Sequence, residues 1–318
     1  MRISFSIKEY LQKIKYSYDH VQELQVDASK RKYFRISNKN NTNILVDSSL
    51  EKNSLKDFIK MSNWLDMEGF SSPRIYDANL IRGYSIMEDF GDNKFSNLFV
   101  KEKENRFFMY SNTIDLLSYL SKKELPSFLK PFSKKIFNKE LSFFLDWYKY
   151  YNKIKNKNEV SEWNKIWSNL YEEATIDKLK TVVLRDFHID NLFLLKNRKG
   201  IKKIGLIDFQ DALIGHPAYD LVSLLQDVRI TISSLKEREL LELYISKNNS
   251  INSSFKISYI IFGTQRLIKI IGIFKRLEYL YGKKKYLIFL PRTLELLKRN
   301  LKNPIFKDLD SWFENYGY

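Results

Sequence analysis

The chain has 318 residues, of which 44% are hydrophobic and 15% aromatic, so it can bury the cores of two domains rather than one. It contains no cysteine, which excludes disulfides, thiol nucleophiles and cysteine-rich zinc sites and fits a reducing compartment. The net charge of +16 comes from lysines and arginines spread along the chain. That spread indicates charged, solvated surfaces rather than a nucleic-acid site, and it favours an anionic substrate over a cationic one.

Targeting and membrane signals are absent from the sequence pattern. The first 17 residues, MRISFSIKEYLQKIKYS, alternate apolar and charged positions and lack the apolar core of a signal peptide. The longest apolar runs, such as YIIF and IIGIF, are too short to span a bilayer. We therefore expect a cytoplasmic monomer that binds no membrane.

The first 90 residues predict a small antiparallel sheet with a helix packed on it. An amphipathic helix at about 6–17 is followed by strands at about 22–26, 32–37 and 43–47. The turn-rich segments DASKR and NKNNT separate these strands. A helix at about 54–68, ended by Gly69 and Pro73, leads to two further strands at about 74–77 and 84–88.

From residue 94 onward the pattern is helical, apart from two apolar, β-rich segments. These are TVVLRDFHIDNLFLL and IKKIGLIDFQDAL, joined by the turn KNRKG. Later helices are expected at about 217–227, 236–247, 254–280 and 284–300, and NKIKNKNEVSEWNK is expected to be a loop or helix junction. No linker rich in Pro, Gly or Ser separates the halves. We therefore predict an α+β fold with two lobes sharing a cleft: a small antiparallel-sheet N-terminal lobe, 1–90, and a mostly helical C-terminal lobe, 91–318.

Three polar residues next to the β-rich segments suggest a chemical site. Asp186 leaves the first strand, Asn191 opens the second, and Asp208 follows the run IGLI. If NLFLL and KIGLI pair as a hairpin, Asn191 and Asp208 lie at the same end, with Asp186 close by. One carboxylate would then take the proton of an attacking hydroxyl, while the amide and the other carboxylate hold Mg²⁺ on the phosphates of ATP. The structural alternative is that these residues cap turns beside two strands.

Six further polar residues are candidates for contacting the substrate or supporting the loop: His188, Gln210, Asp211, Asp220, Gln265 and Arg266. Asp220 stands in the first turn of a helix, where an acid is favoured, and it can also brace the catalytic loop through hydrogen bonds. Gln265 and Arg266 lie in an apolar helix, so they need partners, either on a cleft wall or in a neighbouring loop. His188 has loop packing as its structural alternative.

The motifs resemble those of the aminoglycoside phosphotransferase and choline kinase-like family. They are most similar to its branch of bacterial anomeric kinases for N-acetylmuramate and N-acetylglucosamine. DASKRKYFR resembles the nucleotide loop of that branch, IMEDFGD its hinge, LRDFHIDNLF its catalytic loop and GLIDFQDALIGHPAYDLVSLLQD its metal loop and following helix. GTQRLIKIIGIFKRL and YLIFLPRTLELLKRNL resemble its C-terminal helices less specifically. The resemblance covers about residues 20–315.

This resemblance implies a bilobal, protein-kinase-like fold with an N-terminal nucleotide-binding lobe. ATP would lie between the lobes, with its adenine against the hinge near Met87, Glu88, Asp89 and Phe90. The resemblance also implies Asp186 as the catalytic base and Asn191 and Asp208 as Mg²⁺ ligands, the residues that the spacing indicates by itself.

Three departures from the family pattern bear on ATP binding. Leu184 stands where the wider superfamily often has histidine, and DASKR lacks glycine, so Ala28 and Ser29 would have to let backbone amides approach the phosphates. The third strand ends in Val46 and Asp47 instead of a lysine or arginine. A cation must then come from elsewhere, and the candidates are Lys30, Arg31 and Arg35.

The leading hypothesis is an ATP-dependent phosphotransferase acting on a sugar hydroxyl, the anomeric hydroxyl of N-acetylmuramate or N-acetylglucosamine in cell-wall recycling. Its partners would be ATP, Mg²⁺ and the sugar. A kinase for aminoglycosides or other amines would need an acidic groove, which the net charge of +16 does not indicate. A catalytically inactive scaffold is motivated by the missing third-strand cation. A nucleic-acid binder is the remaining alternative.

Overall fold

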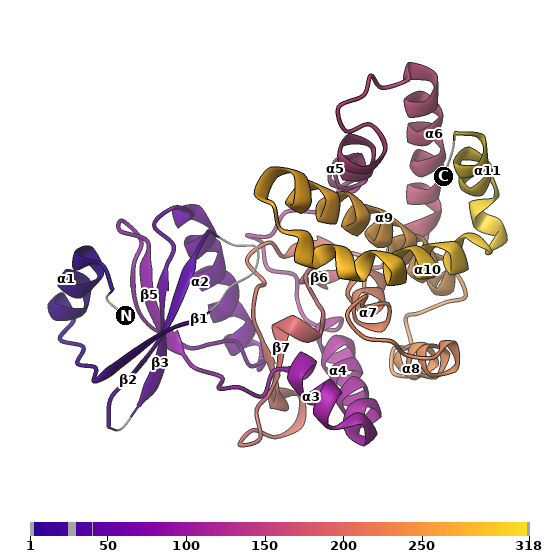
Figure 1. The fold of residues 1–318 in the computed structure, drawn as a ribbon. Helices are drawn as coiled ribbons and strands as arrows, with labels where there is room; N and C mark the ends of the chain where they lie inside the picture. Colours follow the sequence, from indigo (N-terminus) through magenta and orange to yellow (C-terminus); the bar gives the residue numbers. More distant parts are fainter. Residues whose placement is uncertain (1–2, 25–29, 40, 317–318) are drawn as a thin grey trace. The chain divides into compact units, whose positions relative to one another are not determined.

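The computed structural model describes residues 3–24, 30–39 and 41–316 (Figure 1). Their internal contacts group them into two compact units: residues up to 105 with 190–212, and 106–189 with the rest of the chain. The first unit is therefore discontinuous in sequence. That lobe 1–90 binds the nucleotide and lobe 91–318 carries catalysis stays a prediction. The compact units change at residues 105, 190 and 212 rather than at residue 90.

The N-terminal unit is built on a five-stranded antiparallel sheet in the order β1-β2-β3-β5-β4. Its strands are β1 (His20–Leu24), β2 (Lys32–Ser37), β3 (Thr42–Asp47), β4 (Ile75–Asn79) and β5 (Tyr84–Glu88). All five predicted strands are confirmed within about two residues. The expected end of the first strand, residues 25–26, and the candidate Ser29 lie outside the described residues.

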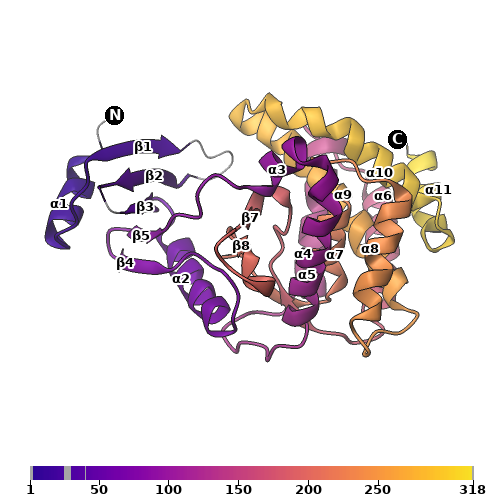
Figure 2. The same ribbon diagram turned by 90° about the horizontal axis from the view of Figure 1, so that it is seen from below.

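Helices cover both faces of this sheet (Figure 2). Residues of α1 (Phe5–Lys13), among them Ile7 and Tyr10, form one core with the inward-facing side chains Phe34 and Leu45. Ile44 alternates with Leu45 along β3 and is also buried, so it faces the opposite side, where α2 (Lys52–Met67) lies.

A second, two-stranded sheet carries part of the predicted site. β7 (Leu192–Leu194) and β8 (Ile204–Leu206) form the predicted antiparallel hairpin. The hairpin attaches to the earlier chain, since the Leu206 N–H donates to the Ser71 carbonyl over 2.8 Å. The rings of Phe58 in α2 and Phe209 stack 4.8 Å apart. The unit is completed by α3 (Phe95–Lys101).

The C-terminal unit is a set of helices with one small sheet. Its helices are α4 (Arg106–Leu120), α5 (Lys134–Phe144), α6 (Lys157–Ala174), α7 (Ala218–Leu225), α8 (Ser234–Ser246), α9 (Phe255–Tyr281), α10 (Leu290–Leu301) and α11 (Lys307–Asn315). Its strands β6 (Thr181–Val183) and β9 (Leu213–Gly215) pair antiparallel. The β9 strand was not predicted, and the helix expected at 284–300 begins with a 3₁₀ turn, the α-helix starting only at Leu290 beside Pro291.

The segment 152–165 was expected to be a loop or helix junction, and it contains the start of a helix. Helix α6 starts at Lys157, where the Asn156 side chain accepts hydrogen bonds from the first backbone amides. Trp163 and Trp167 then point to one side and are fully buried, so helical spacing of large side chains decides the structure of this polar stretch.

Helix α9 packs against α5, α6, α7 and α10. By length and composition it could cross a membrane, which the short apolar runs did not indicate, but 78% of its most apolar window is buried within the protein. Gly272 allows the close contact with the end of α5, since a Cβ there would come within 2.2 Å of the Phe143 carbonyl carbon.

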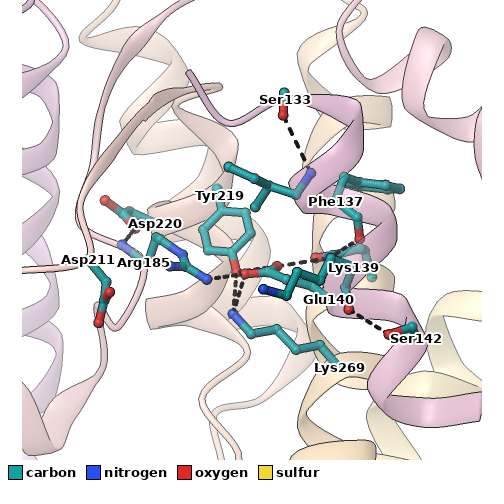
Figure 3. Close-up of polar contacts among 12 residues, drawn as sticks. Ser133, Phe137, Lys139, Glu140, Ser142, Arg185, Asp211, Tyr219, Asp220 and Lys269 are labelled. Atoms are coloured by element: carbon teal, nitrogen blue, oxygen red, sulfur yellow. Dashed lines mark hydrogen bonds and ion pairs between the residues drawn. The ribbon is translucent and has the colours of Figure 1, made fainter. Parts of the chain in front are cut away.

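A buried polar group, the Glu140 cluster, joins α5, α7 and α9 to the loop after β6 (Figure 3). Glu140 is 3% exposed and lies 2.8 Å from the Lys269 ammonium. It also pairs with the Arg185 guanidinium, and it accepts hydrogen bonds from Gln265 (3.0 Å) and the Tyr219 hydroxyl (3.3 Å). Burial by itself would raise the pKa of Glu140, but attraction by Lys269 and Arg185 outweighs it and lowers the pKa to about 2.

We expect Glu140→Gln to lower the free energy of unfolding by about 3 kcal/mol at pH 7, because it leaves two buried cations unpaired. A depressed carboxyl pKa contributes stability above its unfolded value, near 4.5, and loses it as the pH falls towards 2. The difference between wild type and variant should therefore shrink below pH 4.5. Urea denaturation across this range measures it.

The matched control is Glu172→Gln, which removes a carboxylate 68% exposed in its ion pair with Lys134. Its effect should stay within about 0.5 kcal/mol at every pH. An equal loss in the two variants, or a loss in Glu140→Gln that does not change with pH, would contradict the assignment.

Candidate active site

Asn191 and Asp208 meet at one end of the β7–β8 hairpin, as predicted. Asn191 directly precedes β7 and Asp208 follows β8 by two residues, and the register pairs Leu192 with Leu206. The Asn191 amide nitrogen lies 3.4 Å from an Asp208 carboxylate oxygen. The Ile207 N–H donates to the Asn191 carbonyl over 3.2 Å, which fixes this end of the hairpin.

The donor set of this pair fits magnesium. Mg²⁺ takes oxygen ligands, commonly one or two protein groups with phosphate and water completing the shell. Asp208 provides a carboxylate that is 38% exposed, and Asn191 an amide oxygen. Within residues 3–24, 30–39 and 41–316, no three His, Cys, Asp or Glu side chains gather as a metal group. A cation at this pair would therefore need further oxygens from a bound phosphate.

Arg31 and Gln210 surround the Asp208 carboxylate. Gln210 Nε2 donates to Asp208 Oδ1 over 2.9 Å, and Arg31 Nη2 lies 3.3 Å from the same oxygen. Arg31 also contacts Gln210 Oε1 at 3.4 Å and Glu51 at 3.6 Å, and its side chain is only 9% exposed. The sequence candidates Arg31, Gln210 and Asp208 thus form one polar group.

Asp208 has a left-handed backbone, with φ of 61°. Non-glycine residues adopt this conformation uncommonly, although aspartate tolerates it better than most. The turn directs the carboxylate to Asn191 rather than continuing the β8 strand. Such strained positions often accompany functional sites.

The other predicted nucleotide residues contact each other or structural partners. The Arg35 guanidinium donates to Asp89 over 3.1 Å and to Asp92 over 2.9 Å. Glu88 pairs with Arg198 and accepts the Arg74 N–H. Arg35, Glu88 and Asp89 therefore have protein partners near the end of β5, and of the three candidate cations Arg31 is the one at Asp208.

Two more features of this unit involve residues named in the sequence analysis. Asp47, the acid where a third-strand cation was sought, accepts the Ser49 N–H over 3.0 Å and closes a turn. Asp211 lines an open groove together with residues 49–54 at the start of α2.

Asp186 belongs to the C-terminal unit, in the loop that follows β6. The predicted hydrogen bonds from Asp220 to this loop are present: its carboxylate accepts the Leu184 N–H over 2.6 Å and the Arg185 N–H over 2.9 Å. Arg185 has φ of 69°, and its side chain is held by the Glu140 cluster. Burial raises the pKa of Asp220 to about 7, and the nearby charge of Asp186 acts in the same direction.

The remaining candidates lie in the same unit. His188 is buried, and its N–H donates to the Asp186 carbonyl over 3.2 Å, which tightens the loop. Gln265 donates to Glu140, so its partner is structural but lies in helix α5 rather than in the neighbouring loop that the alternative named. Arg266 is 5% exposed, and burial lowers its pKa.

Sequence reasoning missed Glu140 and its ion pair with Arg185. It also missed Asp227, whose carboxylate accepts the Ile189 N–H over 3.1 Å. Glu140 sits in the charged stretch KKIFNKELS, where no local signal marks it for burial. Asp227 ends the apolar run DLVSLLQD, and a polar residue placed there reads as an ordinary helix end.

The chain matches the model of the phosphotransferase enzyme family over residues 20–245. It is 29% identical to the N-acetylmuramate/N-acetylglucosamine kinase of Caulobacter vibrioides over 271 residues, 81% of this chain and 74% of that protein. It is 28% identical to the N-acetylmuramate/N-acetylglucosamine kinase of Neisseria meningitidis serogroup B over 291 residues, 86% and 83% of the two chains.

Solved structures share the fold. The ADP-bound aminoglycoside phosphotransferase APH(2'')-Ib aligns with a TM-score of 0.65 at 16% identity, covering 96% of this chain and 99% of that one. The choline kinase LicA from Streptococcus pneumoniae aligns with a TM-score of 0.65 at 16% identity, covering 93% and 100%. The predicted protein-kinase-like α+β fold is confirmed. Since the family model spans most of the sequence and includes the Asp186, Asn191 and Asp208 motifs, the chain belongs to the phosphotransferase enzyme family.

Proposed function

We propose that this protein is an ATP-dependent kinase that phosphorylates the anomeric hydroxyl of N-acetylmuramate or N-acetylglucosamine. The observation that carries the proposal is the Asn191–Asp208 pair next to a buried arginine, in a phosphotransferase whose relatives are kinases of these sugars. A cytoplasmic role in recycling cell-wall sugars follows from the substrate and fits a chain without cysteine.

The proposed reaction is a single displacement at phosphorus. The anomeric oxygen forms a bond to the γ-phosphorus of ATP while the bond to the bridging oxygen breaks, and ADP leaves. The hydroxyl proton passes to the Asp186 carboxylate, which also orients the sugar oxygen. Asn191 and Asp208 are the residues that would hold Mg²⁺, and that ion would supply charge neutralisation on the phosphates.

Arg31 is the cation we assign to the phosphates in place of a third-strand lysine. It is mostly buried, permanently charged and next to the proposed metal ligand Asp208. Guanidinium groups bind phosphate oxygens in pairs, so Arg31 can exchange part of its contact with Asp208 and Glu51 for a nucleotide phosphate. Glu51 would keep it oriented in the absence of nucleotide.

The choice between sugars rests on charge. N-acetylmuramate carries a carboxylate, whereas aminoglycosides are polycations, and a protein of net charge +16 attracts the former. Both classes of compound belong in the same substrate panel.

Asp186→Asn should lower kcat on the preferred sugar by about 10³-fold, in the range typical of losing a general base. Product identification by NMR should show phosphate on the anomeric carbon with wild type. The control is Asp190→Asn, in the same loop, which we expect to stay within about threefold of wild type. Equal turnover by wild type and Asp186→Asn would remove Asp186 from the mechanism, and no turnover with any substrate by wild type would favour the scaffold.

Arg31→Gln should weaken binding of Mg²⁺ with ADP by about 10- to 100-fold, the strength of a hydrogen bond to a charged group. Calorimetric titration measures this without turnover. Arg31→Lys should recover part of the loss, because it keeps the charge but not the paired donors. The neighbouring exposed Lys30→Gln serves as the control. Unchanged nucleotide affinity in Arg31→Gln would exclude the assignment.

A further inference from the structure

Two buried carboxylates, one at the start of α7 and one just after it, accept hydrogen bonds from the two ends of the same loop. Asp220, in its first turn, accepts the Leu184 and Arg185 amides. Asp227, two residues beyond its last turn, accepts the Ile189 amide over 3.1 Å. The loop that contains Asp186 therefore has one anchor before the proposed base and one after it.

We propose that Asp227, whose buried carboxylate pairs with Arg229, is a positioning residue that holds the far end of the catalytic loop. This inference rests on the proposed function only in taking Asp186 as the base. Ile189, the residue that the anchor holds, stands two residues before Asn191 in the sequence.

Both oxygens of the Asp227 carboxylate accept hydrogen bonds from the protein. It is 1% exposed, and one oxygen accepts the Ile189 amide. The other oxygen accepts the Arg229 N–H and the Arg229 guanidinium, each over 3.0 Å. A buried ionised carboxylate is tolerated only when paired and hydrogen-bonded, and a charged acceptor grips an amide more strongly than a neutral one.

The positive charge that pairs with Asp227 comes from Arg229. The Arg229 guanidinium lies 3.0 Å from the Asp227 carboxylate, which is fully buried. This ion pair and the hydrogen bonds together stabilise the buried carboxylate that accepts the Ile189 amide.

The two anchors make the geometry of Asp186 depend on residues that do not contact the reactants. With the Ile189 end free, the loop would keep its Asp220 contacts, but Asp186 would sample more orientations. Loss of alignment lowers the rate of the chemical step more than it lowers binding of ATP or sugar.

The test compares Asp227→Asn and Asp227→Ala with Asp177→Asn in the full-length protein. Asp177 is the matched control, because its carboxylate is also buried, accepts the Leu179 amide over 3.1 Å and pairs with His216 at 3.0 Å, away from the loop. Asp227→Ala should lower kcat by about 10- to 100-fold, with KM values for ATP and sugar within about threefold of wild type. The kcat of Asp227→Asn should lie between those of wild type and Asp227→Ala.

Hydrogen exchange of the peptide covering 184–191 gives a readout independent of turnover. Exchange at the Ile189 amide should be at least about tenfold faster in Asp227→Ala, and unchanged in Asp177→Asn even if both variants melt at a similar temperature. Should Asp227→Ala fail to fold, Asp227→Asn replaces it, with a smaller loss of kcat and a smaller increase in exchange at the Ile189 amide expected.

The outcomes separate the two proposals. If wild type phosphorylated none of the sugars, the proposed function would be wrong. Hydrogen exchange at the Ile189 amide would then be the test of whether Asp227 anchors the loop. An active wild type with unchanged kcat and loop exchange in the Asp227 variants would overturn the anchor. Equal kcat losses in Asp227→Asn and Asp177→Asn would also overturn it, because loss of protein stability would then explain both.

Discussion

The negative charge of Glu140 is the interaction on which the C-terminal unit depends. This one carboxylate neutralises Lys269 from α9 and Arg185 from the loop after β6, and it accepts hydrogen bonds from α7 and α9. Arg185 is consequently fixed twice, by its side chain at Glu140 and by its amide at Asp220. Two anchors can hold a residue in the left-handed conformation, which costs about 1 kcal/mol or more in an unconstrained chain.

The same principle of matched charge operates around Asp208 in the N-terminal unit. There the carboxylate is partly exposed and faces an arginine, an amide donor and Asn191. Exposure makes this pairing exchangeable, whereas the pairing of Glu140 is buried away from solvent. A rigid ion-pair core under the loop of the proposed base and an adaptable one at the proposed metal ligand suit different tasks, alignment in one case and ligand exchange in the other.

Much of the fold could be predicted because local and tertiary preferences agree. Strand 32–37 matches β2, since the alternation of Phe34 and Ile36 with polar residues is bounded by turn formers. The meeting of Asn191 and Asp208 followed from hairpin pairing alone. Local patterns could not reveal β9, whose three residues carry too little signal, or the start of α6, where buried tryptophans override a polar composition.

The buried charges were the least predictable part of the candidate site. Glu140 and Asp227 become meaningful only once helices distant in sequence bring Lys269, Arg185 and Ile189 beside them. Arg31 could be named as a candidate, but its selection over Lys30 and Arg35 needed its contact with Asp208. Partners far apart in the chain are invisible to any periodicity.

The discontinuity of the N-terminal unit has a consequence for biosynthesis. Because residues 190–212 belong to it, the segment up to 105 leaves the ribosome well before its own hairpin is made. Ser71 and Phe58 must wait for Leu206 and Phe209, with the first helices of the other unit translated in between. The early chain is thus a nascent sheet with an unfilled docking surface, a stage at which chaperone protection would matter most.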